Sequence, residues 1–134
     1  MKTYALDASA LFAFLQKKLG APTVNRIMKD ATRGEAQVLM SAVNYGEVYG
    51  SIHRDHGLDQ AQTTMRAVGP LPIEVLDATS PRCFHAAEVK ARYKLYYADS
   101  FAAALAIEHT ATLVTSDSDF RKLGHAFPIV WLKI

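Results

Sequence analysis

The chain has 134 residues, of which 50% are hydrophobic and 21% are charged, and its formal net charge is +2. This balance is typical of a globular protein and predicts one domain over residues 1–134, while the mild positive charge permits a nucleic-acid partner without requiring one. A single cysteine excludes an internal disulfide, and no apolar run is long enough to span a membrane, so we expect a cytoplasmic protein without a membrane anchor.

The first 54 residues predict two strands and three helices. In chain order these are a strand at 2–6, a helix at 10–19, a helix at 22–33, a strand at 37–40 and a helix at 42–54. Ser9 and Ser41 stand where a serine side chain can cap the following helix. Gly46 and Gly50 lie four residues apart in the third helix, where each glycine costs about 1 kcal/mol relative to alanine. Close packing of another backbone segment against this glycine face is the expected compensation.

The rest of the chain continues the alternation of helices and strands. In chain order it predicts a helix at 58–68, a strand at 73–76, helices at 80–95 and 98–109, a strand at 113–115, a short helix at 120–123 and a strand at 129–132. The helix at 80–95 is expected to bury the face formed by Phe84, Ala87, Ala91 and Leu95. Phe127 and Trp131 are expected in the core. Strands alternating with helices favour a parallel α/β sandwich.

Carboxylates stand at the ends of two predicted strands. Asp7 follows the first strand, and Asp117 and Asp119 follow the strand at 113–115. In a parallel sheet these ends meet at one edge, where ligands bind. An acidic turn that caps a short helix through Asp119, Phe120 and Leu123 is the alternative explanation of the later pair. Asp99 lies in the first turn of the helix at 98–109. An antiparallel return is expected to place that turn at the opposite edge, so topology alone does not bring Asp99 to the other acids.

Four sequence blocks resemble the PIN domain family, and more narrowly the VapC-type toxin ribonucleases of toxin–antitoxin pairs. The blocks are Leu6-Asp7-Ala8-Ser9, Asn44-Tyr45-Gly46-Glu47-Val48, the run from Ala98 to Ala106, and Thr115-Ser116-Asp117-Ser118-Asp119-Phe120. They follow the family's order over essentially the whole chain. The resemblance implies a PIN-like three-layer α/β/α sandwich with a short, mainly parallel central sheet. It also implies that four catalytic acids share one pocket at the carboxyl edge of the sheet, namely Asp7, Glu47, Asp99 and Asp117.

The resemblance further implies a ribonuclease that uses Mg²⁺ or Mn²⁺. Carboxylates that share a pocket raise one another's pKa, a divalent cation removes this repulsion, and ligation by oxygen alone suits these two metals. The expected metal ligands are Asp7, Asp99, Asp117 and Asp119. Asp119 would serve a second ion or only cap its turn, and Glu47 would complete the site or orient a metal-bound water. Thr115 and Ser9 match supporting hydroxyl residues of the family.

The resemblance implies three partners: an RNA substrate, a cognate antitoxin protein that blocks the acidic pocket, and a second copy of the chain in a homodimer. Candidate RNA-binding residues are Arg82, Arg92, Lys94 and Arg121, which equally suit a solvated helix face. Two alternatives remain open from the residues. One is a PIN scaffold that binds RNA or protein without catalysis, and the other is a metal-dependent phosphatase or phosphotransfer domain.

Overall fold

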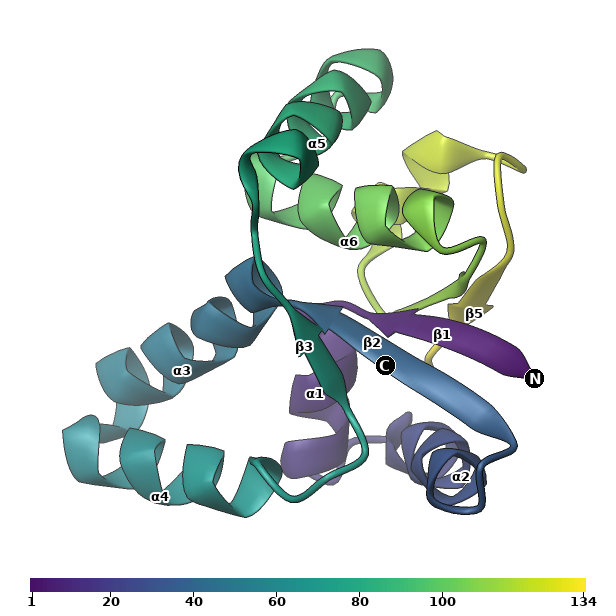
Figure 1. Ribbon diagram of the computed structural model, residues 1–134. Helices are drawn as coiled ribbons and strands as arrows, with labels where there is room; N and C mark the ends of the chain where they lie inside the picture. Colours follow the sequence, from purple (N-terminus) through teal and green to yellow (C-terminus); the bar gives the residue numbers. More distant parts are fainter.

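A five-stranded parallel sheet forms the centre of the molecule, which the computed structural model describes over residues 1–134 (Figure 1). Its strands are β1 (Lys2–Leu6), β2 (Ala36–Ser41), β3 (Glu74–Leu76), β4 (Thr112–Thr115) and β5 (Ile129–Trp131). They lie in the order β3-β2-β1-β4-β5, and every neighbouring pair is parallel. The five strands predicted from short apolar runs are therefore confirmed, and the sheet is parallel throughout.

The strands that follow β1 in the chain are added first on one side of it and then on the other, which makes β1 the switch point of the sheet. The sheet grows through β2 and β3 on one side of β1 and through β4 and β5 on the other. Leu6, the last residue of β1, pairs with Met40 and Val114, so these strands end near the same edge. At such a switch point the connections leave the central strands in opposite directions and open a crevice. Asp7 follows β1 at this point.

Two helical layers cover the sheet and complete the expected α/β/α sandwich (Figure 1). One layer consists of α1 (Ala8–Leu15), α2 (Ala21–Thr32), α3 (Ala42–His56) and α4 (Leu58–Val68), and the other of α5 (Ser80–Tyr93), α6 (Tyr97–Glu108) and the 3-10 helix η1 (Ser118–Leu123). Side chains of β1 alternate between the two cores, because Leu6 packs with the first layer and Ala5 with the second. None of the helices combines the length and the apolar character needed to cross a lipid bilayer.

Small side chains let α6 lie close to the sheet. Ala102, Ala103 and Ala106 are fully buried and share a core with Ala5 of β1 and Leu113 of β4. This packing fixes α6 across the central strands, and the position of its first turn follows from it.

The first helix differs from the prediction at both ends. Its cap is Asp7 rather than Ser9, because the Asp7 carboxylate accepts a hydrogen bond from the backbone N–H of Ala10. The helix ends at Leu15 rather than near residue 19, because Lys17 adopts a left-handed backbone conformation with φ 52°. Asp7 therefore has a structural role in addition to its place at the end of β1.

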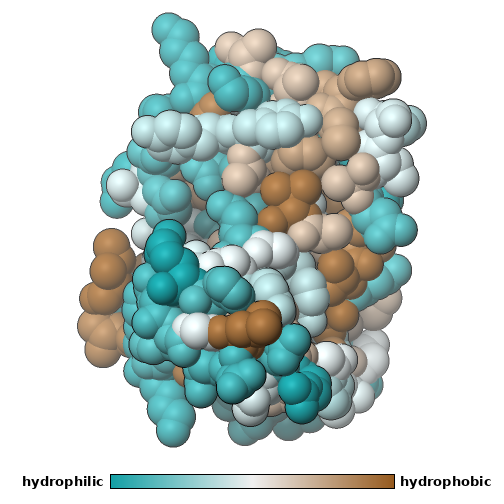
Figure 2. All heavy atoms as spheres, turned by 90° about the vertical axis from the view of Figure 1, so that its left-hand side faces the viewer, coloured by the Kyte–Doolittle hydropathy of each residue, from teal (hydrophilic) through white to brown (hydrophobic).

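The predicted apolar face of α5 is wrong for three of its four residues. Phe84, Ala87 and Ala91 are exposed, and the helix buries Ala86 and Val89 instead. The reason is that α5 packs against α6 rather than against the sheet, so a different face is covered. Figure 2 shows the side of the molecule on which α3 and α4 project, where apolar side chains are mixed with polar ones.

Two further predictions about packing are wrong. No atom outside the local helix lies within 4 Å of a Cβ built at Gly46 or Gly50, so no backbone packs against the glycine face of α3. Trp131 is 43% exposed rather than buried, because it lies on the edge strand β5. Phe127 does pack, as a partly buried residue, against the core beneath α5 and α6.

Candidate active site

Asp7 is a buried carboxylate held from three directions. Its Oδ1 accepts hydrogen bonds from the Ser9 hydroxyl at 2.6 Å and from the Ala10 backbone N–H at 2.9 Å. Its Oδ2 accepts one from the Thr115 hydroxyl at 2.5 Å, and the residue is only 4% exposed. A carboxylate oxygen has two lone pairs, so Oδ2 keeps one for a further ligand. The donors therefore fix the direction in which Asp7 can act.

The hydroxyls of Ser9 and Thr115 join Asp7 to the loop after β4. Ser9 Oγ accepts a hydrogen bond from the backbone N–H of Ser116 at 3.0 Å, and Thr115 Oγ1 accepts one from that of Asp117 at 2.9 Å. The two hydroxyl oxygens lie 3.2 Å apart. Both residues thus have a supporting place beside Asp7, where they fix the start of the acidic loop.

Three acids converge within the crevice. Asp99, Asp117 and Asp119 each offer a carboxylate oxygen, and these oxygens all lie within 4.8 Å of one another. Asp117 Oδ1 also accepts the backbone N–H of Asp119 at 2.9 Å and caps η1. The capping role considered for Asp119 therefore belongs to Asp117. All three acids are half-buried, and none pairs with a basic side chain.

Asp99 reaches this group because of where α6 begins. The helix ends at Glu108, and only three residues separate it from the start of β4 at Thr112, so its end lies near the start of that strand. Its first turn consequently lies toward the edge where β4 ends. The expectation that Asp99 would lie at the opposite edge was wrong, because a helix that leads back to the start of a parallel strand begins at the carboxyl edge of the sheet.

Glu47 lies beside the group without joining it. It is exposed on α3, and its Oε1 accepts a hydrogen bond from Asn44 Nδ2 at 2.9 Å. Its negative charge contributes to the raised pKa of Asp99, so both acids share one electrostatic environment. Asn44 is a site residue to which no role was assigned from the sequence. The signal that pointed to it was its spacing of three residues from Glu47, which places both on one helix face.

The pKa values of two acids reflect burial and mutual repulsion. Burial raises the pKa of Asp7 to about 6, although the hydrogen bonds from Ser9, Thr115 and Ala10 oppose this effect. Burial, followed by the charges of other acids in the crevice, raises the pKa of Asp99 to about 7. Perturbed carboxylates in a crevice are typical of functional sites.

The donor set of the crevice fits a hard divalent cation. It offers only oxygen atoms, it includes no His or Cys, and its negative charge has no cationic partner within the protein. Oxygen ligands favour Mg²⁺ and Mn²⁺ over zinc. Asp99, Asp117 and Asp119 are spaced to share one ion. Asp7 is not one of this group, although its charge also contributes to the raised pKa of Asp99.

Basic residues gather near the start of α6 and at η1. Lys122 Nζ donates a hydrogen bond to the backbone oxygen of Lys94 at 3.1 Å, which ties η1 to the turn between α5 and α6. The guanidinium of Arg121 lies 5.4 Å from the centre of the Trp131 ring, and that of Arg92 lies 5.3 Å from the Tyr93 ring. Lys94 and Arg121 therefore flank the segments that carry the acids.

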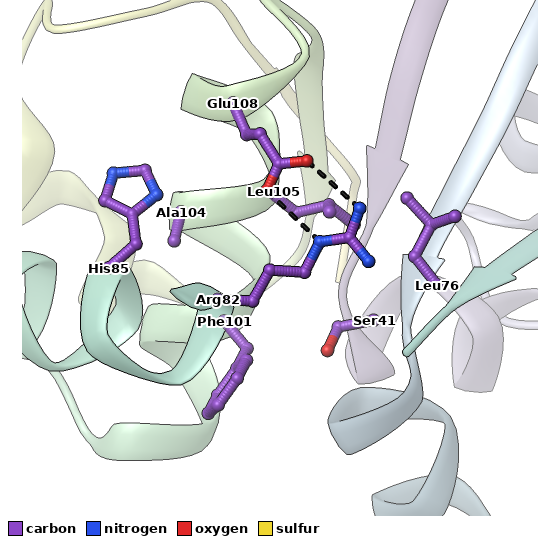
Figure 3. A pocket seen from close by; sticks show the side chains of 8 residues that line it. All are labelled: Ser41, Leu76, Arg82, His85, Phe101, Ala104, Leu105 and Glu108. Carbon is purple, nitrogen blue, oxygen red and sulfur yellow. Dashed lines mark hydrogen bonds and ion pairs between the residues drawn. The ribbon is translucent and has the colours of Figure 1, made fainter. Parts of the chain in front are cut away.

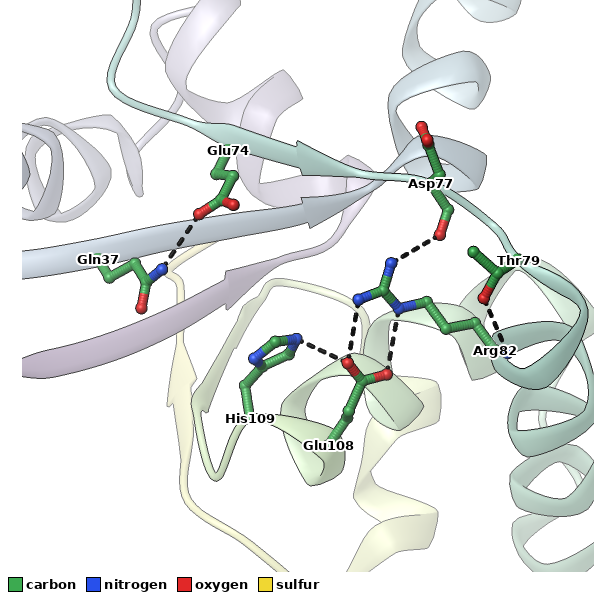
Figure 4. Close-up of polar contacts among 7 residues, drawn as sticks. All are labelled: Gln37, Glu74, Asp77, Thr79, Arg82, Glu108 and His109. Carbon is green, nitrogen blue, oxygen red and sulfur yellow. Dashed lines mark hydrogen bonds and ion pairs between the residues drawn. The ribbon is translucent and has the colours of Figure 1, made fainter.

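Arg82 does not reach the rim of the acidic crevice. Its guanidinium forms two hydrogen bonds with Glu108, at 3.1 and 3.2 Å, and a third with the backbone oxygen of Asp77 (Figure 4). Glu108 ends α6 and Asp99 lies in its first turn, about 14 Å away along the helix. The pocket beside Arg82 has a volume of about 10 Å³, enough for about one water molecule (Figure 3).

The fold and the crevice define an open parallel α/β protein with an acidic site at the switch point of its sheet. The sequence matches the family model of the PIN domain over residues 4–126, and the chain belongs to the PIN domain family. No curated protein is significantly similar in sequence.

Solved structures with the same fold include chains of toxin–antitoxin complexes. A chain of VapBC2 from Rickettsia felis bound to promoter DNA has a TM-score of 0.75 at 17% identity, covering 98% of this chain and 99% of its own. A chain of DNA-bound VapBC from Salmonella typhimurium has a TM-score of 0.74 at 15% identity, covering 97% and 98%. VapC20 from Mycobacterium tuberculosis, described as a toxin that cleaves the sarcin–ricin loop, has a TM-score of 0.71 at 18% identity, covering 90% and 95%. These TM-scores establish a shared fold.

Proposed function

We propose that the chain is a Mg²⁺- or Mn²⁺-dependent ribonuclease that acts as the toxin of a toxin–antitoxin pair. The observation that carries this proposal is the convergence of Asp99, Asp117 and Asp119 within 4.8 Å, without a basic partner, at the switch point of a PIN-domain sheet. The cleavage of RNA by a toxin of the same fold supports RNA as the substrate class.

The proposed catalytic acids are Asp7, Glu47, Asp99 and Asp117, with Asp119 as a further metal ligand. A bound divalent cation lowers the pKa of an attacking water and stabilises negative charge on the phosphate. Asp99, Asp117 and Asp119 would hold the ion between α6 and the loop after β4. Asp7 would orient a ligand through the free lone pair of Oδ2, because Ser9 and Thr115 fix its carboxylate. Glu47 would face the same space from α3.

Positive charge around the crevice would attract the phosphate backbone of RNA, which the acids alone repel. Lys94, Arg92 and Arg121 are the proposed RNA-binding residues. Arg82 is a weaker candidate because Glu108 already pairs with it. The same acidic crevice would attract a basic side chain of an antitoxin, which would compete with the metal and the substrate.

A homodimer is the proposed assembly. The exposed parts of α3, α4 and α5 are the candidate surface, since α5 leaves Phe84 67% exposed on the face that neither α6 nor the sheet covers. The complexes of the related fold support an antitoxin as a second protein partner.

The direct test is cleavage of RNA with Mg²⁺ or Mn²⁺ by the wild type, Asp7→Asn and Asp99→Asn. Each substitution is expected to slow cleavage by about 100-fold or more, because it removes a charge that acts on the reacting phosphate or its metal. Glu88→Gln, an exposed substitution on α5, is the matched control and should cleave as fast as the wild type. Equal rates for the site variants and the wild type would show that the site assignment is wrong.

Calorimetry separates catalysis from a scaffold role. The wild type is expected to bind Mn²⁺, and Asp99→Asn to bind it at least about tenfold more weakly. A wild type that binds RNA but neither Mn²⁺ nor Mg²⁺ would favour a non-catalytic PIN scaffold.

A further inference from the structure

We propose that Asn44 is a positioning residue of this site. Its side-chain amide holds the carboxylate of Glu47 and the first turn of α6, which carries Asp99, in one fixed arrangement. The inference rests on the proposed function, because it assigns a role within the same acidic crevice.

The burial of Asn44 calls for a physical reason. Asn44 is only 1% exposed, at the third position of α3. Asparagine is a poor helix former, and a buried amide is unfavourable unless it is hydrogen-bonded. A leucine has the same branched heavy-atom framework without a polar group. Packing alone therefore does not account for an asparagine here.

Both hydrogens of the Asn44 amide are used. Nδ2 donates to Glu47 Oε1 at 2.9 Å and to the backbone oxygen of Ala98 at 3.0 Å. An amide nitrogen has two hydrogens, so the two bonds exhaust it. Glu47 is exposed and has no ion pair, so this bond is what restrains a side chain that would otherwise populate several rotamers.

The remaining atom of the amide is unsatisfied. Asn44 Oδ1 is buried and has no hydrogen-bond partner. A half-turn of the amide would place this oxygen against Glu47 Oε1 and the Ala98 oxygen, which are both acceptors, so the orientation is determined. The fold retains an unpaired buried acceptor in order to keep the two donated bonds. Such an exception is expected where function constrains the residue.

The hydrogen bond from Asn44 to the Ala98 backbone oxygen also restrains the position of Asp99. Ala98 directly precedes Asp99, whose carboxylate meets those of Asp117 and Asp119 within 4.8 Å. A shift of the first turn of α6 would move Asp99 away from that group. One amide on α3 therefore sets the position of two acids, as groups that orient metal ligands do in other sites.

A double-mutant cycle on Mn²⁺ affinity tests this role. Asn44→Leu keeps the branched heavy-atom framework of the side chain and removes the amide, and it is expected to weaken Mn²⁺ binding about tenfold. Glu47→Ala changes an exposed residue and removes the acceptor. If Asn44 acts through Glu47, the loss caused by Asn44→Leu should shrink to about threefold or less when Glu47 is already alanine. An unchanged loss in that background, or a loss below about twofold in the wild type, would overturn the inference.

Ser100→Ala provides the matched control. Ser100 is fully buried in the same turn of α6, where its hydroxyl donates to the Tyr96 backbone oxygen at 2.9 Å. This substitution loosens the turn without touching Glu47 or its amide partner. The Mn²⁺ affinity of the Ser100→Ala variant should stay within about twofold of that of the wild type. A loss equal to that of Asn44→Leu would show that general loosening of α6 is the cause and would overturn the inference.

Hydrogen exchange of the side-chain amide, followed by NMR in the metal-free protein, separates this inference from the proposed function. The Asn44 amide hydrogens should exchange at least about tenfold more slowly than those of the exposed Asn25, and Glu47→Ala should speed their exchange. Exchange as fast as that of Asn25 would overturn the inference. A wild type that binds no Mn²⁺ would instead overturn the proposed function, and the exchange rates would still decide whether Asn44 holds Glu47.

Discussion

Replacing Asp99 by asparagine should stabilise the metal-free protein at pH 8 while abolishing RNA cleavage. Burial and the neighbouring acids raise the pKa of Asp99 from an ordinary 3.8 to about 7. The folded chain therefore binds more protons than the unfolded chain between about pH 4 and pH 7, and its stability falls as the pH rises through this range. Asparagine resembles the neutral acid and removes the repulsion that appears above pH 7.

The expected gain in the free energy of unfolding follows from the shift in the pKa of Asp99. A difference of about three pKa units corresponds to about 4 kcal/mol before solvent screening. Asp99 is half-buried, so screening by water reduces this value, and we expect Asp99→Asn to raise the free energy of unfolding by about 1 to 2 kcal/mol. For a chain of this length the melting temperature should rise by about 5 °C.

The assay is thermal and urea unfolding in the presence of a chelator at pH 8 and pH 5. The gain should be full at pH 8 and clearly smaller at pH 5, and it should vanish only below about pH 4, because at pH 5 Asp99 is protonated in the folded wild type but already ionised in the unfolded chain. Glu88→Gln, an exposed acid on α5, should change the stability by less than about 0.5 kcal/mol at either pH. Addition of Mn²⁺ at 100 times its dissociation constant should stabilise the wild type by about 2.7 kcal/mol and the variant by less. A variant no more stable than the wild type at pH 8, or a gain at pH 5 as large as that at pH 8, would refute the reasoning.

Three other substitutions probe the support of the site, the helix beside it and the rim. Thr115→Val removes the hydroxyl that donates to Asp7 Oδ2. It should lower the free energy of unfolding by about 2 kcal/mol, measured by urea unfolding, and weaken Mn²⁺ binding about tenfold, measured by calorimetry. If neither loss is observed, Thr115 does not support the Asp7 carboxylate. Gly50→Ala should stabilise α3 by about 0.5 to 1 kcal/mol in urea unfolding, because a Cβ there meets no atom within 4 Å, and a loss of stability would reveal a contact on that face. Arg121→Ala, in an Asp99→Asn background that prevents cleavage, should weaken RNA binding and reduce its salt dependence by about 0.7 in the logarithmic slope for one lost phosphate contact. Fluorescence anisotropy at several salt concentrations measures that slope, and an unchanged slope would exclude Arg121 from phosphate binding.

Local sequence patterns were enough to predict the alternation of strands and helices and the place of the acids along it. Short apolar runs marked all five strands, and helical spacing marked the helices that cover them. Asp7, Asp99 and Asp117 could be named as candidate site residues because each stands at a strand end or a helix start within a block that resembles the family. These are local features, which depend on neighbouring residues of the chain.

Contacts between segments far apart in the sequence could not be predicted from local sequence patterns. The choice of face on α5 depended on its packing against α6, so Phe84 is exposed and Ala86 is buried. The exposure of Trp131 depended on the strand order, which places β5 at the edge. Neither packing partner is encoded in the periodicity of the element itself.

The candidate site also combines features that sequence spacing predicts with features that depend on tertiary contacts. Sequence spacing could place Asn44 and Glu47 on one helix face, but only the tertiary structure brought the Ala98 backbone oxygen to the same amide. It also decided that Asp117 rather than Asp119 caps η1, which leaves both acids beside Asp99. The sequence determined which carboxylates were available. Folding determined their distances, because these depend on how α6 and the loop after β4 pack against the end of β1.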